Sequence, residues 1–301
     1  MPTASEGRFE WWDALAALPA LRLRCHVQLR SGGSVRPGEL RGAIGHRLMA
    51  AGNREALACF FPANRDEAAV GPFGHATPWA LHLDHGGRLE IGIFADGVPH
   101  LVALLQALME ASRGRVGSHQ GIVLEQLEHQ PHLVDGEWRP GLPGAPGRWV
   151  PAPFPKGEVE LLLLSPLRLR RRGEELRPAD LRPRDLLSAL MRRVSGLLAQ
   201  AGLAMPPWDA KAMLEAIASA GFPERELDTQ IQARYSSRQG QAMALRGLQG
   251  RLRLPSEFVR LAWPLLWMGQ ALHVGKTPCL GMGCYQLLVK QAETREALPG
   301  C

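Results

Sequence analysis

The sequence predicts an α+β protein built from two units with the same order of elements, strand–helix–strand–strand–helix–strand. Residues 21–30 alternate strictly between apolar and polar side chains, which is typical of a strand with one buried face. Apolar residues recur at helical spacing after that strand, and the whole order repeats beyond a Pro- and Gly-rich stretch at 130–157. With 301 residues, the chain is long enough for two domains that each bury a core.

The first unit follows from local patterns. Leu21 to Leu29 place every second side chain on an apolar face and leave Arg22, Arg24 and His26 on the other face. Proline at the start and apolar residues one turn apart predict a helix over 36–52. A hairpin over 79–94 turning at 84–87, a helix over 98–111 and a strand over 121–129 complete the unit.

The second unit repeats this order. We expect strands over 158–169, 229–237, 245–254 and 284–290, with helices over 184–202, 208–221 and 256–273, the last capped by Ser256. The predicted fold is therefore two tandem ferredoxin-like (RRM-like, βαββαβ) domains with an Arg-rich helical elaboration in the second. Their expected boundaries are 1–130 and 157–301, joined by a linker at 131–156. The repeat is one of architecture and not of sequence.

Composition narrows the function classes. Lys and Arg total 35 against 29 Asp and Glu, and the sequence contains only four lysines, so the positive charge is mostly guanidinium. Guanidinium groups favour phosphate or carboxylate partners. The five cysteines form no CxxC pair, and no signal-peptide pattern or apolar run of bilayer length occurs, so we expect a reduced cytoplasmic protein. Cys279 and Cys284 near His273 fit no common zinc spacing, so no metal is expected.

The stretch HVGKTPCLGMG at 273–283 contains a Gly-Lys-Thr that is reminiscent of a nucleotide-binding loop. Such a loop needs a first glycine separated from Gly275 by four residues, a position that Gln270 occupies, and it needs a strand before it and a helix after it. The predicted order here is helix, then loop, then strand. We therefore expect no nucleotide cofactor. Two explanations stay open for the glycines: close approach to RNA phosphates, or turns that require positive φ.

Two segments resemble a known family. RYSSRQGQAMALRGLQGRL followed by WPLLWMGQALHVGKTPCLGMGCYQL resembles the C-terminal half of the CRISPR precursor-RNA-processing endoribonucleases of the RAMP superfamily, which carry a glycine-rich loop before the last strand of a second ferredoxin-like domain. GELRGAIGHRL resembles the first helix of the same family. The resemblance implies a metal-independent RNase that cuts within each CRISPR repeat, leaves a 2′,3′-cyclic phosphate, stays bound to its product and enters an effector complex. A type IV-associated member is one possibility.

Metal-free RNA cleavage needs proton transfer and cations near the phosphate. His46 is the first candidate for proton transfer, because an imidazole titrates near neutrality and this one lies beside glycines on the predicted helix. A histidine hydrogen-bonded across the domain interface is the alternative. Arg24, His26, Arg36 and Arg41 are candidates for stabilising or orienting the phosphate, and an ordinary solvated face is the alternative for them.

Arginine is dense between 167 and 193, which suits closely spaced RNA phosphates, although partial pairing with nearby acids is an alternative. The predicted RNA-binding residues are Arg168, Arg170, Arg171, Arg172, Arg177, Arg192, Arg193, Arg234, Arg238, Arg246, Gly275, Lys276, Gly281 and Gly283. No RNP-type aromatic pair is evident, so base stacking in the RRM manner is not expected. The expected partners are CRISPR repeat RNA and other effector subunits, with no membrane. A non-catalytic RAMP subunit that grips guide RNA, and a general stem-loop-binding regulator, are the competing functions.

Overall fold

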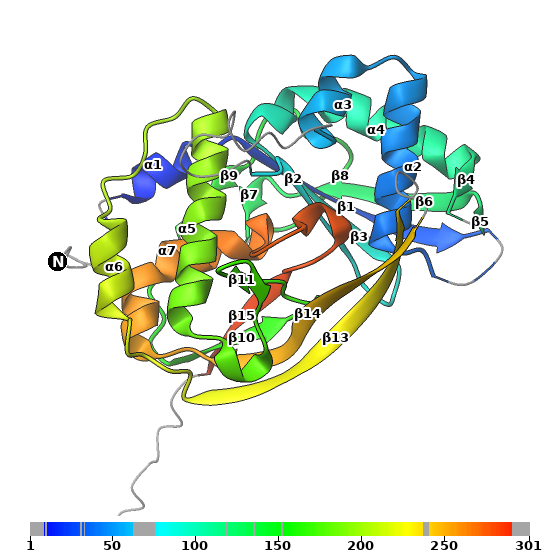
Figure 1. The fold of residues 1–301 in the computed structure, drawn as a ribbon. Coiled ribbons are helices and arrows are strands. Elements are labelled where there is room, and N and C mark those ends of the chain that lie inside the picture. Colours follow the sequence, from blue (N-terminus) through cyan, green and yellow to red (C-terminus); the bar gives the residue numbers. More distant parts are fainter. Residues whose placement is uncertain are drawn as a thin grey trace, which may run out of the picture.

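The computed structural model describes residues 9, 11–30, 32, 34–62, 76–117, 119–134, 136–151, 153–236 and 241–290, with the backbone alone for 232–236 and 241–243. It is a mixed α/β protein with antiparallel sheets, as the sequence predicts (Figure 1). In each of its two main sheets, the first strand of a unit lies between the third and the fourth.

The first sheet has the order β2-β3-β1-β6-β8. Leu21, Leu23 and Val27 of β1 pack in one core with α2 and α4, so both helices cover the same face of this sheet. The elements of the first half are α1 (Trp12–Ala16), β1 (Ala20–Leu29), α2 (Pro37–Ala50), α3 (Arg54–Phe60), β2 (Trp79–Leu83), β3 (Arg88–Phe94), the 3-10 helix η2 (Ala95–His100), α4 (Leu101–Arg113), β4 (Arg115–Val116), β5 (His119–Gln120) and β6 (Ile122–His129).

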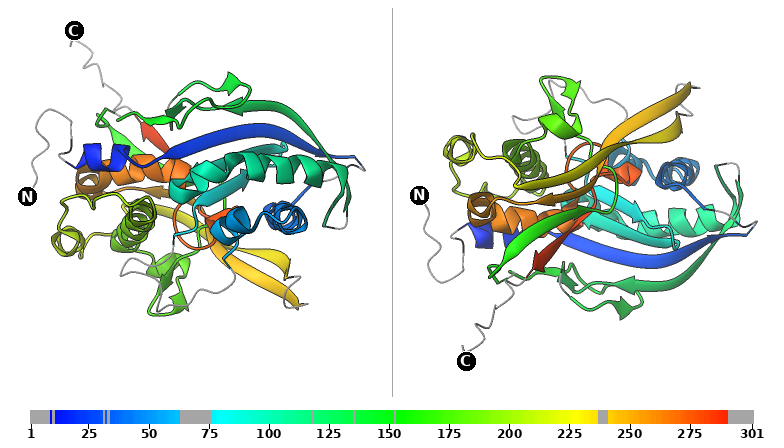
Figure 2. Two further views of the ribbon diagram at one scale, coloured as in Figure 1. Left: turned by 90° about the horizontal axis from the view of Figure 1, so that it is seen from above. Right: turned by 90° about the horizontal axis from the view of Figure 1, so that it is seen from below.

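The second sheet has the order β13-β14-β10-β15, and α5 and α7 share its core. The long β13–β14 hairpin projects from the body of the molecule past α2 (Figure 2). The elements of the second half are β10 (Glu158–Leu163), β11 (Arg170–Arg171), β12 (Glu174–Glu175), the 3-10 helix η3 (Pro178–Asp180), α5 (Pro183–Gln200), α6 (Ala210–Ala216), β13 (Glu224–Ser236), β14 (Gln241–Arg253), α7 (Ser256–Leu272), the 3-10 helix η4 (Pro278–Leu280) and β15 (Tyr285–Lys290).

The stretch expected to be a linker contains structure of its own. It forms β7 (His132–Leu133), β8 (Arg139–Pro140) and β9 (Arg148–Trp149), and β8 pairs with β6 as an additional strand of the first sheet. The indole N–H of Trp149 donates to the Leu18 carbonyl at 2.8 Å, and Trp149 packs in the core of the second unit. Neither β-propensity nor periodicity signals such two-residue strands.

Other differences from the sequence prediction are local. The strand expected over 158–169 ends at Leu163, because Ser165 and Pro166 follow it, and the second hairpin is longer than expected, with thirteen residues in each strand. Helix α6 is shorter than predicted, and α1 and α3 were not expected. Ser256 is the first residue of α7 and not its cap, because Pro255 occupies the capping position. None of the described helices is long and apolar enough to cross a membrane.

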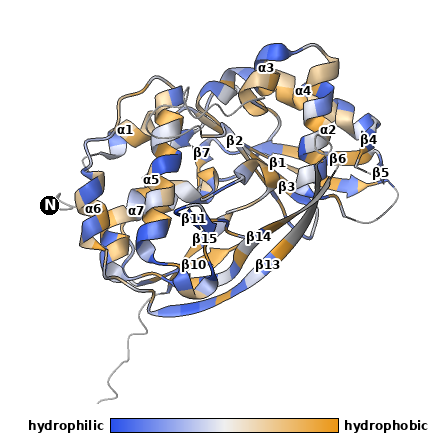
Figure 3. Cartoon of the chain, in the orientation of Figure 1, coloured by the Kyte–Doolittle hydropathy of each residue, from blue (hydrophilic) through white to orange (hydrophobic). Residues whose placement is uncertain are grey.

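Helix α5 carries both hydrophobic and hydrophilic residues (Figure 3), and Arg193 is a charged residue on its buried side. Its Nε donates to the Leu272 carbonyl at 3.1 Å, and its Nη1 donates to the Thr77 carbonyl. The guanidinium also lies over the Phe94 ring, 5.6 Å from the centroid. Burial lowers its pKa to about 10, so the group stays charged at neutral pH. Arg193 thus joins α5 and the end of α7 to the segment before β2.

We expect Arg193→Met to lower the free energy of unfolding by about 3 kcal/mol, because two buried carbonyls lose a charged donor. The neighbouring Arg192 is exposed, so Arg192→Met is a matched control that should change stability by less than about 0.5 kcal/mol. Urea denaturation of the two variants measures the difference. Equal midpoints would show that Arg193 contributes nothing beyond its volume.

Candidate nucleic-acid interface

The chain between α7 and β15 makes a loop whose backbone repeatedly enters the left-handed region. Within 273–283 the residues with positive φ are His273 (58°), Gly275 (90°), Thr277 (61°), Gly281 (81°) and Gly283 (74°). A side chain at 283 would place its Cβ 1.8 Å from the Val274 carbonyl oxygen. Turn geometry therefore accounts for these glycines without any ligand. The helix-before, strand-after order that argues against a nucleotide-binding loop is also present.

This glycine loop, residues 273–283, packs against the first unit. A Cβ on Gly281 would lie 2.7 Å from Cγ of Pro37, the first residue of α2, and 3.7 Å from the Leu81 carbonyl oxygen on the edge strand β2. Leu280 and Met282 are buried in the core that contains α2. The loop thus lies along the edge of the first sheet and beside the start of α2. Gly281 and Gly283 are buried in this packing, and their role in RNA binding stays a prediction.

Two imidazoles meet where the loop leaves α7. The rings of His82 on β2 and His273 lie 6.4 Å apart, centroid to centroid, and neither Nδ1 has a hydrogen-bond partner among the described residues. Burial is the main cause that lowers the pKa of His273 well below 6.5, and the nearby His82, Arg193 and Arg22 lower it further. Burial also lowers the pKa of His82. Both rings are therefore neutral at pH 7.

Helix α2 separates its predicted catalytic residues. Arg41 lies one turn after Pro37 and therefore on the side of the helix that meets the loop; it is half-buried, with its guanidinium 4.5 Å from the Phe61 ring centroid. Arg36 precedes the helix and is exposed. His46 is exposed on the side opposite the buried stripe, about 140° around the helix from Arg41. The ring of Phe61 fills the space beside Gly45, whereas the space beside Gly42 is open.

Arg24 and His26 belong to a different surface. They project from the face of β1 opposite the one that packs against α2, so they do not join His46 and Arg41 at one site. Arg24 is paired with Glu128 at 2.7 Å and lies over the Trp138 ring, and His26 Nε2 is 2.7 Å from the Gly86 carbonyl oxygen. Alternation along the strand predicts the basic face correctly, but only the fold shows that this face lies across the sheet from α2.

The predicted RNA-binding arginines differ in availability. Arg168 and Arg171 are held by acids, with Nη2 of Arg168 2.6 Å from Glu175 Oε1 and Arg171 gripping Asp185 with two nitrogens. Arg193 is buried inside the protein, so it is not available to RNA in this conformation. Arg170 also pairs with Glu175, at 3.5 Å. The exposed members of the set are Arg170, Arg171, Arg172, Arg177, Arg192, Arg246 and Lys276. The side chain of Arg234 and all of Arg238 lie outside the described residues.

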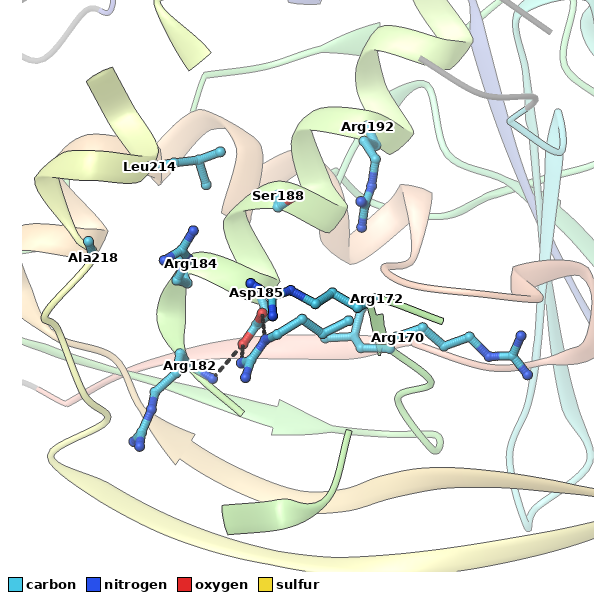
Figure 4. A pocket seen from close by; sticks show the side chains of 11 residues that line it. Arg170, Arg172, Arg182, Arg184, Asp185, Ser188, Arg192, Leu214 and Ala218 are labelled. Carbon is cyan, nitrogen blue, oxygen red and sulfur yellow. Dashed lines mark hydrogen bonds and ion pairs between the residues drawn. The ribbon is translucent and has the colours of Figure 1, made fainter. Parts of the chain in front are cut away.

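The first turns of α5 and the hairpin β11–β12 enclose a pocket of about 440 Å³ (Figure 4). Six arginines and one carboxylate provide its charged lining, and apolar residues of the hairpin, α6 and the residues after it complete the wall. The lining residues are Leu169, Arg170, Arg171, Arg172, Arg182, Arg184, Asp185, Ser188, Arg192, Leu214 and Ala218. Arg182 and Arg184 are not among the RNA-binding residues predicted from the sequence. The signals that could have found them are the arginine density of 167–193 and their position at the start of a helix.

The second half of the chain matches a known protein family. Residues 161–285 match the family model of CRISPR-associated endoribonuclease Cas6. The matched segment begins within β10 and contains the hairpin β13–β14 and the glycine loop. The resemblance to the CRISPR RNA-processing endoribonucleases is thereby confirmed.

The Cas6-like architecture extends beyond the matched segment. A solved Cas6 of Thermus thermophilus is 18% identical in sequence and superposes with a TM-score of 0.54 over 91% of this chain and 100% of that chain. Another Cas6, solved as a product complex, is 20% identical, with a TM-score of 0.51 over 90% of this chain and 99% of that one. At this identity the similarity shows a shared fold. No curated protein matches by sequence. The type IV association stays a prediction.

We expect Gly281→Ala to destabilise the protein by about 2–4 kcal/mol. A positive φ and a Cβ pressed against the Pro37 ring both oppose the substitution. Gly42→Ala is the matched control, because its Cβ meets nothing within 4 Å inside a helix, and it should stabilise by about 0.5–1 kcal/mol. Urea midpoints report both effects. A Gly281→Ala midpoint at or above that of the wild type would contradict the docked loop.

Acid should destabilise the protein through His273. Its pKa rises to the ordinary 6.5 on unfolding, so the unfolded chain binds a proton that the folded protein excludes. Stability is thus retained above pH 6.5 and lost as the pH falls below it. In His273→Asn, which keeps a residue that tolerates positive φ, the slope should be shallower by up to about 1.4 kcal/mol per pH unit. Unfolding curves between pH 8 and pH 5 measure it, and parallel curves for the two proteins would refute it.

Proposed function

We propose that this protein is a metal-independent endoribonuclease that binds the stem-loop of a CRISPR repeat and cleaves precursor crRNA. One observation carries the proposal: the glycine loop is docked beside the start of α2, where Arg36 and Arg41 flank the helix terminus. Lys276 is exposed on the same loop. Arg246 is exposed on β14, but side chains alternate along a strand, so it points to the face opposite the one on which Leu245 packs with α2. Cations from two segments, the start of α2 and the glycine loop, thus lie beside one seam between the two halves of the chain. The Cas6 family match includes the glycine loop.

The cleavage chemistry requires the RNA 2′-OH to attack the adjacent phosphate, which yields a 2′,3′-cyclic phosphate and a free 5′-hydroxyl. Alignment of the 2′-oxygen with the phosphorus supplies much of the rate, and guanidinium groups stabilise the charge that develops on the phosphate. Arg41 and Arg36 are proposed for that electrostatic role. An arginine is always protonated and cannot act as a base. His46 is therefore kept as the proposed proton-transfer group, for an RNA that continues from the seam over the exposed side of α2.

The proposal extends to the organisation of the chain. We assign two tandem ferredoxin-like domains at 1–130 and 157–301 with the segment 131–156 between them, and we regard the arginine-rich region around α5 as an elaboration of the second domain. The exposed Arg170, Arg172, Arg177 and Arg192, with Arg246 and Lys276, are the proposed phosphate contacts. Retention of mature crRNA and entry into an effector complex with other CRISPR subunits are part of the same proposal.

Incubation of the protein with its host's labelled repeat RNA in EDTA tests the activity. We expect cleavage at one position and a product that ends in a cyclic phosphate. If RNA is bound and never cut at any ionic strength, the protein is instead a non-catalytic subunit that grips guide RNA. Equal affinity for unrelated hairpins would point to a general stem-loop-binding protein.

Two variants separate the proposed roles. We expect His46→Ala to lower the cleavage rate by about 10²–10⁴ and to flatten its pH dependence, because proton transfer is lost. Arg41→Ala should lower the rate by about 10²–10³ at every pH and leave the shape of the profile unchanged, because charge stabilisation is lost. Arg54→Ala, an exposed arginine on α3, is the control. If His46→Ala keeps the wild-type rate and profile, the histidine assignment fails while the nuclease function stands.

A further inference from the structure

The arginine-lined pocket between the hairpin β11–β12 and α5 is far more cationic than its ion pairs require. It contains six arginines and one acid, Asp185. Both oxygens of Asp185 bind Arg171, and Oδ2 also accepts the backbone N–H of Arg182 at 2.9 Å. The carboxylate is thus occupied by one guanidinium and one backbone N–H. In the described part of the chain, no ion pair involves the side chains of Arg172, Arg182, Arg184 or Arg192. Several like charges in one concavity repel one another unless an anion neutralises them.

The pocket is held in shape by the paired arginines. Arg171 clamps the hairpin to α5 through Asp185 and donates to the Asp180 carbonyl at 2.8 Å. Arg168 fastens the base of the hairpin through Glu175. The turn then carries Arg172 at φ 52°, followed by Gly173 at φ 87°. A non-glycine residue in the left-handed region has a conformational cost, and such positions are often functional. Arg172 thus lies in the turn of the hairpin and on the lining of the pocket.

The far wall of the pocket is apolar. Leu214 of α6 and Ala218 beyond it lie across from the hairpin arginines (Figure 4). A free phosphate ion makes no favourable contact with an apolar wall, whereas the ribose or base of a nucleotide can pack against it. The volume of about 440 Å³ suits one nucleotide and is too small for a duplex. Unpaired nucleotides are the part of an RNA that can enter pockets, because their bases are free to unstack.

The pocket is adjacent to the glycine loop. The backbone N–H of Lys276 donates to the Arg168 carbonyl at 2.8 Å, and Arg168 stands two residues before β11. An RNA strand that leaves the seam beside α2 and passes Lys276 therefore comes close to Arg168, and from there to Arg170 and Arg172.

We propose that this pocket binds one unpaired nucleotide of the RNA that flanks the stem, with its phosphates on the unpaired arginines and its ribose or base on Leu214. The assignment rests on the proposed function, because it takes repeat RNA as the ligand. It adds a discrete single-strand site, separate from the seam where the phosphodiester is cut.

Binding of a non-cleavable repeat RNA, with 2′-deoxy substitutions at the cut site, tests the pocket. For the triple variant Arg172→Ala/Arg184→Ala/Arg192→Ala we expect at least a tenfold loss of affinity at low salt. The slope of log affinity against log salt should be shallower by about 2, since each lost contact to single-stranded phosphate removes about 0.7. Leu214→Ala should weaken binding several-fold without changing the slope. The charge-matched control Arg54→Ala/Arg113→Ala/Arg260→Ala, three exposed arginines outside the pocket, should leave the slope unchanged.

The same stem without its unpaired flanks decides which part of the RNA is bound. The difference between wild type and the triple variant should disappear on this blunt RNA. If the difference persists there, the pocket binds the duplex and the single-strand assignment is overturned. If neither RNA distinguishes the triple variant from the charge-matched control, the pocket is not an RNA site. These measurements do not involve cleavage. If the protein fails to cut RNA in EDTA, the proposed nuclease activity is wrong, while the binding measurements still decide whether the pocket binds RNA.

Discussion

The contact on which most of this structure depends is the packing of the glycine loop against the edge strand β2 and the first residue of α2. It is possible only because Gly281 adopts a left-handed backbone with no side chain, which lets the loop approach Pro37 closely. The same contact buries Leu280 and Met282 in the core of the first half, and it covers an edge strand that would otherwise be open to pairing. The position of Lys276 relative to α2 is a direct result of that packing.

Much of the fold could be predicted because its patterns are local. The strand predicted from alternation is β1, and the helix predicted from apolar spacing is α2. The helix–loop–strand order predicted around 273–283 is also present. The two-residue strands at 132–149 could not be predicted, because their pairing partners are distant in sequence and their own propensity is weak. The candidate site was predictable only by residue type. Periodicity placed Arg24 on a polar face, but which side of the sheet α2 covers is decided by tertiary packing.

The arginines show why composition alone cannot assign a binding surface. Arginines that are adjacent in sequence differ in environment. Arg192 lines an open pocket, whereas Arg193 is buried and donates hydrogen bonds to backbone carbonyls. Arg171 and Arg172 differ in the same way, because only Arg171 reaches Asp185. Each acid in this region pairs with particular guanidinium groups, which are then less available to bind RNA phosphates. The cationic surface is therefore smaller and more localised than the sequence indicates.

The segment at 131–156 packs against both halves of the chain. Its strand β8 completes the first sheet, while Trp149 is inserted among side chains of the second half and is anchored to Leu18 near the beginning of the chain. If the segment stayed with only one half, either the first sheet would lose its strand β8 or the core of the second half would lose the side chain of Trp149. The segment therefore contributes to the packing of both halves, and exchange of halves between relatives would require this segment to be exchanged as well.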